Sequence, residues 1–192
     1  HIGVLRVLER EGFRVAALAG SSIGGLVAAV YAAGYNPDAL EEQMGSLELS
    51  KLLRVSLRAP DSLLSLEGVE AILKDLLGDR RFEDLDIPLA LTGLDVVSGH
   101  EVVLKEGPLV DGVLATIALP GIFPSRHIGE YQLVDGGISN PTPVAVARSL
   151  APGLPVVAVP LAPALGEEKD GGTSQADMQS LPFPSQIKRL KW

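Results

Sequence analysis

The first eleven residues alternate between apolar and charged side chains with the period of an α-helix. Val4, Leu5 and Leu8 fall on one face of this helix, and the charged residues lie mostly opposite. Gly12 predicts its end, because glycine readily adopts the left-handed conformation that terminates many helices. A short apolar run of strand length follows over 13–20 and itself ends in glycine. This part of the chain is therefore expected to form an amphipathic helix and a strand.

An uncharged stretch over 15–37 raises the question of a membrane span. About 20 consecutive apolar residues cross a bilayer as a helix. The centre of this stretch, however, contains Gly20, Gly24 and Gly25 together with two serines, and glycine weakens a continuous helix. We therefore favour a buried strand that turns sharply into a helix over 22–33, with the membrane span as the alternative.

Further elements are bounded by glycine and proline. Asn36 and Pro37 are residue types typical of a helix N-cap and first position, so a helix is expected to begin there. Strands that alternate with helices imply a layered α/β fold with a largely parallel, buried sheet. The remaining expected elements are a helix over 66–77, two strands joined by a turn at Ser98 and Gly99, a helix over 109–118, a hairpin turning near Gly129, a helix over 143–150 and a buried strand over 154–162.

Composition sets the class of protein and excludes several chemistries. The chain has 192 residues, 46% of them hydrophobic and 21% charged, which is typical of one folded domain. Its net charge is −8 and basic residues cluster only at the extreme C-terminus, which argues against a nucleic-acid partner. The lack of cysteine excludes disulfides, thiolate metal sites and cysteine nucleophiles. The three histidines share no helical face, so a zinc centre is not expected.

The domain is expected to span 1–165. After Leu165 the composition shifts to glycine, serine, glutamine and acidic residues, so 166–192 is interpreted as a linker or mobile tail. The helical pattern begins at His1 without a charged leader or cleavage site, so this opening segment is not interpreted as a signal peptide, and the natural start is expected upstream of it. The expected location is cytoplasmic. The final SQIKRLKW mixes basic and apolar residues. A frayed or packed terminal helix is favoured there, with a peripheral membrane-surface contact as the alternative.

One serine stands in a pattern typical of catalytic serines. Gly20, Ser21, Ser22, Ile23 and Gly24 read G-x-S-x-G between the predicted strand and helix. A serine on such a tight turn adopts a strained backbone, and glycines two places to either side relieve collisions. The turn also places Ser22 at the helix N-terminus, where the dipole favours developing negative charge. The alternatives are a glycine-rich turn without chemistry and a phosphate-binding loop, although the latter would need a lysine after the glycines.

A serine nucleophile needs a group that accepts its proton, and the sequence offers two. The first is His127, which with Asp95 or Asp111 would complete a Ser-His-Asp triad in the chain order of α/β-hydrolases. The second is Asp135, where an apolar run ends before two glycines that let the backbone turn closely. A carboxylate is a weak base for a hydroxyl, so it must touch the serine where water is scarce. The alternative for Asp135 is a purely structural turn, since Asp-Gly is a common turn pair.

Four segments together resemble the patatin-like phospholipase family. They are HIGVLRVLE at 1–9, GSSIG at 20–24, ATIALPGIFPS at 115–125 and DGG at 135–137, in the family's order and rough spacing. The resemblance covers 1–161 and implies a three-layer α/β/α fold with a central, mostly parallel sheet. It implies a catalytic dyad without histidine, in which Ser22 is the nucleophile and Asp135 the general base. The glycines that support these motifs are Gly20, Gly24, Gly136 and Gly137.

The resemblance also implies what surrounds the dyad. Similar proteins carry a glycine-rich segment just upstream of the His-Ile-Gly motif, and its backbone N–H groups form the oxyanion hole. This segment follows the first strand of the sheet in similar proteins. We therefore expect both that strand and the oxyanion hole upstream of His1, outside this chain. Asp95 falls where similar proteins often have a Thr-Asp pair, but it follows Leu94 and is interpreted as structural. The expected substrate is a phospholipid or another acyl ester, with no metal and no organic cofactor.

Other functions stay open at this point. A non-catalytic lipid- or partner-binding domain would keep the same fold, although the presence of both Ser22 and Asp135 in matched contexts argues against it. A hydrolase that uses Ser22 and His127 is the second alternative, and an acyltransferase, which usually relies on a histidine, is the third. Residues 49–66 are apolar without clear periodicity. An ordinary connecting helix is favoured there, with a lid or acyl-chain surface as the alternative. The sequence carries no signal for an oligomeric state.

Overall fold

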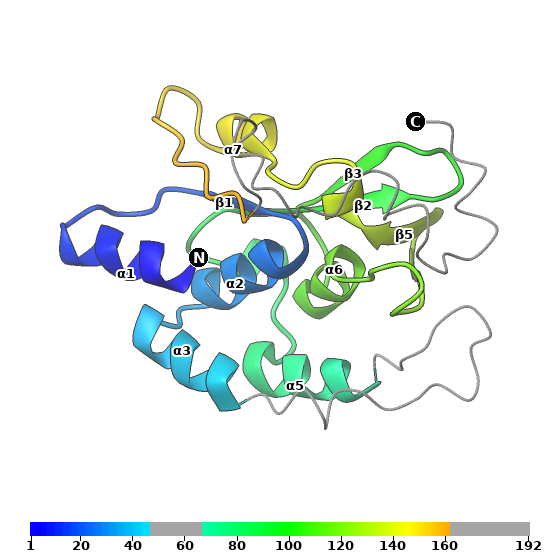
Figure 1. Cartoon of the computed structure of the whole chain (residues 1–192), viewed down its shortest axis with the longest axis horizontal. Coiled ribbons are helices and arrows are strands. Elements are labelled where there is room, and N and C mark those ends of the chain that lie inside the picture. Colours follow the sequence, from blue (N-terminus) through cyan, green and yellow to red (C-terminus); the bar gives the residue numbers. More distant parts are fainter. Residues whose placement is uncertain (47–66, 162–192) are drawn as a thin grey trace, which may run out of the picture.

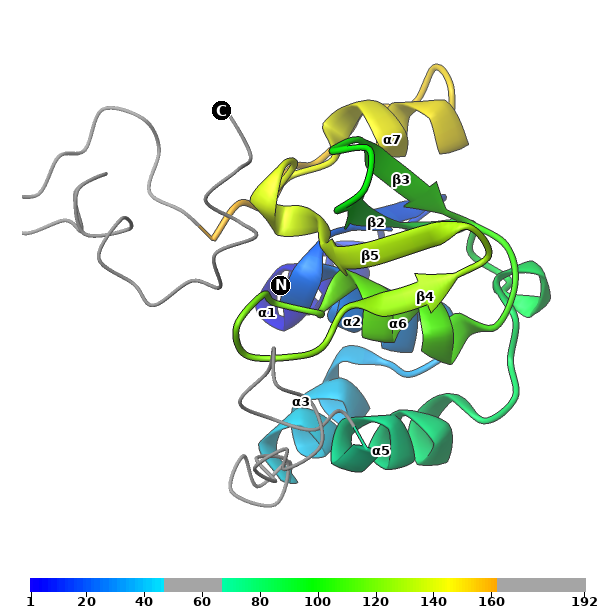
Figure 2. The same cartoon turned by 90° about the vertical axis from the view of Figure 1, so that its right-hand side faces the viewer.

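The computed structural model describes residues 1–46 and 67–161. Its α-helices are α1 (Ile2–Arg10), α2 (Ser22–Ala32), α3 (Pro37–Ser46), α5 (Glu67–Leu77), α6 (Leu109–Thr116) and α7 (Val144–Leu150). Figure 1 shows α7 on one face of a sheet and α2 and α6 on the other, and Figure 2 shows α3 and α5 farther out beyond α2 and α6. The predicted three-layer α/β/α fold is confirmed.

A five-stranded sheet forms the middle layer. The strands are β1 (Leu18–Gly20), β2 (Leu89–Asp95), β3 (Glu101–Leu104), β4 (Arg126–Ile128) and β5 (Tyr131–Asp135). All seven residues of β2 are buried, and β2 pairs with β1, β3 and β5. The sequence predicted a mostly parallel sheet. Among the described strands β1 and β2 are parallel, and the other three pairs are antiparallel. Two of these pairs are hairpins, since a short turn returns the chain beside itself.

Two strands meet end to end beside β2. Leu91 pairs with both β1 and β3, and Gly93 pairs with both β3 and β5. Because a strand residue has one neighbour on each side, β3 occupies one side of β2, and β1 and β5 share the other. β1 runs parallel to β2 and β5 runs antiparallel to it. Their last residues, Gly20 and Asp135, therefore face each other beside Thr92.

The α2 helix lies at the centre of the core. Its residues from Val27 to Ala32 are all buried, and it packs against β1, β2 and α6. The uncharged stretch over 15–37 is thus divided into a strand, a turn and an eleven-residue helix. Such a helix is about 16 Å long, against about 30 Å for the hydrocarbon core of a bilayer. The membrane-span alternative is wrong. Across 1–46 and 67–161, no helix combines the length and apolar character that crossing a bilayer needs.

The ends of most helices follow the predicted signals. Asn36 Oδ1 accepts a hydrogen bond from Ala39 N at 2.9 Å and so caps α3. Gly12 and Gly78, which follow α1 and α5, have φ of +79° and +60°. The helix predicted over 109–118 is two residues shorter in the structure, where α6 ends at Thr116.

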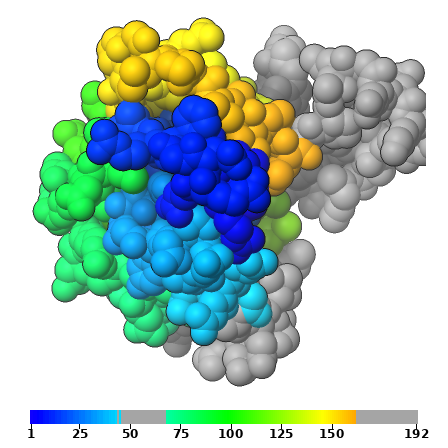
Figure 3. All heavy atoms as spheres, turned by 90° about the vertical axis from the view of Figure 1, so that its left-hand side faces the viewer, coloured from blue at the N-terminus to red at the C-terminus, as the bar shows by residue number. Residues whose placement is uncertain are grey.

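The predicted buried strand over 154–162 is wrong for its described residues. Residues 154–161 form no strand, and Leu154, Val157 and Leu161 are 53%, 64% and 69% exposed. Apolar composition signals burial, but a buried strand also needs a neighbouring strand, and none of the described strands pairs with this segment. The segment instead lies beside the start of α1 (Figure 3, orange beside dark blue), where His1 Nε2 donates to Val159 O at 3.2 Å.

Three predictions fall outside the described residues. They concern the connecting helix or lid over 49–66, the tail over 166–192, and the terminal SQIKRLKW segment.

Candidate active site

Ser22 lies on a strained turn between β1 and α2. Its φ is +53°, in the left-handed region that residues with a side chain rarely adopt, and no other described non-glycine residue has a positive φ. A Cβ added at Gly20 would lie 2.6 Å from Gly25 Cα, so no larger residue fits there without a backbone shift. At Gly24 an added Cβ would meet only the His1 ring, at 3.4 Å. The steric demand of the turn therefore falls on Gly20 rather than Gly24.

Asp135 ends β5 in direct contact with this serine. Its Oδ2 accepts a hydrogen bond from Ser22 Oγ at 2.5 Å, and its Oδ1 accepts one from Gly137 N at 2.7 Å. Asp135 is 3% exposed, and burial raises the pKa of its carboxyl group. The two hydrogen bonds offset part of this rise because they favour the charged form. The carboxylate is thus shielded from water and held by both oxygens.

The turn after β5 fits only because it contains glycine. A Cβ at Gly136 would lie 2.4 Å from Thr92 O, and a Cβ at Gly137 would lie 3.0 Å from Asp135 Oδ1. On the other side of β5, Asp135 N donates a hydrogen bond to Ala118 O at 3.0 Å. The end of β5 is therefore fixed between β2 and the segment that follows α6.

The structure does not assemble the triad alternative. His127 lies on β4 with its side chain exposed, and Asp111 accepts a hydrogen bond from Arg126 Nη2 at 2.6 Å. Among the described candidate bases, Asp135 is the one in hydrogen-bonding contact with Ser22.

Asp95 holds the hairpin that follows β2. Its Oδ2 accepts hydrogen bonds from Ser98 Oγ at 2.6 Å and Ser98 N at 2.9 Å, and its Oδ1 accepts one from Gln132 N at 3.0 Å. These hydrogen bonds lower the pKa of Asp95 to about 2, and the bond from the Ser98 hydroxyl contributes most. The carboxylate therefore joins the turn between β2 and β3 to β5.

Comparison with known proteins identifies the family. The family model described as Patatin-like phospholipase matches residues 1–148, which is well over half of the chain. The chain belongs to the patatin-like phospholipase family. Members of this family are generally lipid acyl hydrolases, and the predicted family resemblance is confirmed.

Individual relatives extend this patatin-like assignment. An uncharacterised NTE family protein of Mycobacterium tuberculosis is 34% identical over 148 residues, which cover 76% of this chain and 41% of the relative. A patatin-like phospholipase domain-containing protein of Caenorhabditis elegans is 31% identical over 157 residues, covering 78% of this chain and 12% of the relative. A rat protein with the same kind of name is 28% identical over 157 residues, again covering 78% and 12%. The chain thus spans less than half the length of these relatives.

Three hydroxyl residues of this patatin-like site were not predicted from the sequence. Ser21, Thr92 and Thr116 are all buried around the Ser22–Asp135 pair. The two threonines interrupt the apolar runs LALTGL and GVLATIAL, and a lone polar residue inside such a run was the available signal. A pattern of apolar positions treats these residues as core and does not show which buried groups they bond.

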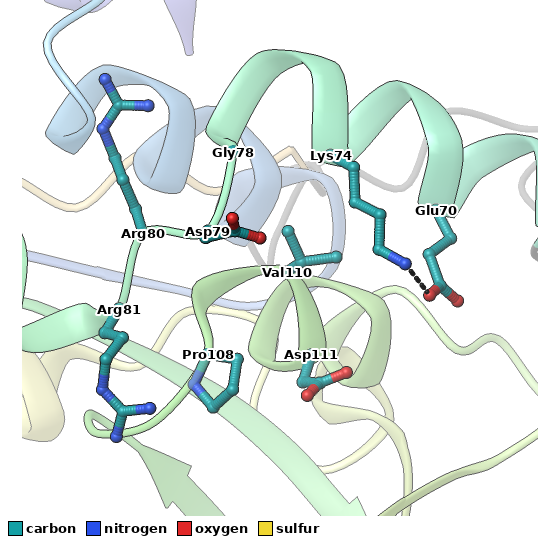
Figure 4. Close-up of a pocket in the computed structure, with 9 residues that line it drawn as sticks. All are labelled: Glu70, Lys74, Gly78, Asp79, Arg80, Arg81, Pro108, Val110 and Asp111. Atoms are coloured by element: carbon teal, nitrogen blue, oxygen red, sulfur yellow. Dashed lines mark ion pairs between the residues drawn. The ribbon is translucent and has the colours of Figure 1, made fainter.

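A separate open cavity of about 460 Å³ lies between α5 and the start of α6 (Figure 4). Two of its charged residues pair with each other: Lys74 Nζ lies 2.9 Å from Glu70 Oε1, as the dashed line in Figure 4 marks. Arg126 joins Glu70 at 3.4 Å and Asp111 at 2.6 Å. None of the residues that line the cavity belongs to the turns around Ser22 and Asp135. These ion pairs join α5, α6 and β4 beside the cavity.

Proposed function

We propose that this chain is a serine acyl hydrolase domain that cleaves carboxylic esters of lipids through a Ser22–Asp135 dyad. The observation that carries the proposal is the 2.5 Å hydrogen bond from Ser22 Oγ to a buried carboxylate oxygen, made from a strained turn. A hydroxyl becomes a useful nucleophile when a base takes its proton as it attacks. Direct contact and exclusion of water are what a carboxylate needs for that task.

The mechanism has two steps that share one base. Ser22 Oγ attacks the ester carbonyl carbon while Asp135 accepts the hydroxyl proton. The resulting tetrahedral intermediate expels the alcohol or lysolipid, to which Asp135 returns the proton, and leaves an acyl group on Ser22. Asp135 then takes a proton from water, and the hydroxide equivalent attacks the acyl-enzyme. The fatty acid departs as the proton returns to Ser22 Oγ, so both steps balance with water as the only co-reactant.

The oxyanion of the intermediate needs donors close to Ser22. The N-terminus of α2 supplies a favourable dipole at this position. The backbone N–H of Ser22 itself is bonded to Thr116 Oγ1 at 3.0 Å and is not free for the oxyanion. The glycine-rich segment expected upstream of His1 would supply the remaining donors.

The substrate class follows from the family, whose members generally act on lipids. We propose a phospholipid or another acyl ester as substrate, presented from a membrane or micelle surface that the protein contacts peripherally. The proposed chemistry requires no metal and no organic cofactor, because the dyad supplies both nucleophile and base.

Hydrolysis of a p-nitrophenyl acyl ester and of a phospholipid by the full-length protein tests this function. Ser22→Ala and Asp135→Ala are each expected to lose about 10³-fold or more in kcat, since they remove the nucleophile and the base. His127→Ala is the matched control and should keep most of the activity. Strong loss in His127→Ala together with an active Asp135→Ala would favour the triad. A folded but inactive wild type that binds lipid would favour the non-catalytic binding domain.

A further inference from the structure

Three hydroxyl groups lie behind the Ser22–Asp135 pair. Ser21 is 6% exposed, and Thr92 and Thr116 are 0% exposed. They come from three elements, namely the turn after β1, the β2 strand and the end of α6. A buried hydroxyl that lacks a partner destabilises a fold, so the bonds that each one makes indicate its role.

Thr116 uses its hydroxyl on two backbone groups at once. Its Oγ1 accepts a hydrogen bond from Ser22 N at 3.0 Å and donates one to Thr92 O at 2.7 Å. The first bond holds the N–H of the residue with φ of +53°, and the second anchors Thr116 to the central strand. Its methyl group packs against Gly25, where an added Cβ would lie 2.9 Å from Thr116 Cγ2. The residue therefore combines a hydrogen-bonding function with a packing function.

Ser21 and Thr92 complete the connection to the turn after β5. Ser21 Oγ donates a hydrogen bond to Asn140 O at 2.6 Å and also bonds to Thr92 Oγ1. Because Ser21 Oγ donates its one proton to Asn140 O, Thr92 Oγ1 is the donor in the bond between the two hydroxyls. Asn140 N in turn donates to Gly136 O at 2.9 Å. A continuous chain of hydrogen bonds thus joins the two turns that carry Ser22 and Asp135.

We propose that Thr116 is a positioning residue. It holds the Ser22 backbone so that Ser22 Oγ stays hydrogen-bonded to Asp135. The role rests on the proposed function, in which these two residues are nucleophile and base. Thr116 acts through the Ser22 N–H and touches no reacting atom. An unfavourable φ persists only when neighbouring bonds fix it. A displacement of about 1 Å at a reacting group can lower the rate about 10²-fold. The bond from Thr116 is thus expected to govern the reactivity of Ser22.

Two substitutions separate the hydrogen bonds of Thr116 from its packing. Thr116→Val keeps the shape and the methyl group but loses both bonds, whereas Thr116→Ser keeps the hydroxyl and loses the methyl group. The measurement is the rate at which a fluorophosphonate labels Ser22 in the full-length protein. Thr116→Val should be labelled about 10²-fold more slowly. Thr116→Ser should stay within a few-fold of the wild type.

A structural readout accompanies the labelling rate. Hydrogen exchange of the Ser22 amide should be slow in the wild type and in Thr116→Ser, and fast in Thr116→Val. The amide of Val30, deep in α2, serves as the control for an intact fold and should stay protected in all three. The acid limb of the labelling rate should also move to higher pH in Thr116→Val, because a displaced Ser22 no longer lowers the pKa of Asp135.

The outcomes separate the positioning role from the proposed function. Labelling of Thr116→Val at the wild-type rate, or equal losses in both variants, would overturn the positioning role. If Thr116→Val does not fold, the labelling rate of Thr116→Ser is the test. A large loss of rate in this variant contradicts a role that depends on the hydroxyl. A wild type that takes no label overturns the proposed function. Exchange of the Ser22 amide then still shows whether Thr116 holds the turn.

Discussion

At the residue scale, the burial of Asp135 favours the proposed proton transfer but destabilises the folded chain. An ionised carboxylate loses favourable hydration when it is buried, and its hydrogen bonds restore only part of this energy. The raised pKa of Asp135 records the net effect. It also makes the carboxylate a stronger base than an exposed aspartate, which suits the proposed transfer of the Ser22 proton. The position is therefore expected to limit the stability of the folded chain at neutral pH.

Replacing this charge should stabilise the protein. A raised folded-state pKa means that the folded chain binds more protons than the unfolded chain, so stability falls as pH rises through that pKa. Asp135→Asn removes this penalty. It should unfold at a higher temperature than the wild type at pH 7, with the difference vanishing near pH 3, while ester hydrolysis is lost. Thermal unfolding across this pH range measures the effect, and an Asn variant that is less stable at pH 7 would contradict it.

Asp95 provides a control of opposite sign. The hydrogen bonds from Ser98 and Gln132 lower its pKa to about 2, so its charge stabilises the folded state above the unfolded value. Asp95→Asn should therefore lower the unfolding temperature at pH 7. The loss should shrink as pH falls toward 2, where Asp95 of the wild type is also protonated. Two aspartates of the same sheet would then show opposite pH dependences for a stated physical reason.

At the scale of elements, the β1–α2 turn depends on how closely the helix approaches the strand. The site where a side chain does not fit is Gly20, because its space is filled by the Gly25 backbone. Gly24 faces only the His1 ring at ordinary contact distance. The two glycines of the G-x-S-x-G pattern are therefore not equivalent in this structure.

A matched pair of alanine substitutions tests this difference. Gly20→Ala should destabilise the fold by about 1–3 kcal/mol, because the backbone of α2 has to move away. It should also slow the labelling of Ser22. Gly24→Ala should change stability by no more than about 1 kcal/mol, since alanine suits a helix better than glycine does. Urea unfolding and the labelling rate measure both effects, and equal losses in the two variants would be inconsistent with the geometry.

Elements with a clear periodic pattern were predictable from the sequence. Elements whose formation depends on a neighbouring strand were not. The helices over 2–10, 67–77 and 144–150 lie where apolar periodicity and glycine or proline boundaries place them. The segment over 154–161 has the composition of a buried strand, but it pairs with none of the described strands. Hydrophobic composition reports a preference for burial, whereas pairing depends on which backbone lies alongside.

At the scale of the whole molecule, the site arises where two strands end at the same point beside β2. Ser22 and Asp135 are 113 positions apart in the chain, so local patterns carry no information on their contact. The residues alone left the choice between His127 and Asp135 open, and the family resemblance pointed to Asp135. The threonines could not be assigned from the sequence, since their bonds depend on the register of β2 against its neighbours and on the packing of α6.

The proposed chemistry of the site requires Ser22 to be an activated nucleophile. Intact-mass measurement of the full-length protein and of its Ser22→Ala variant, after incubation with a fluorophosphonate, tests this most directly. The expected result is a single adduct on the wild type and none on Ser22→Ala. A folded wild-type protein that takes no adduct, or an adduct that persists in Ser22→Ala, would contradict it.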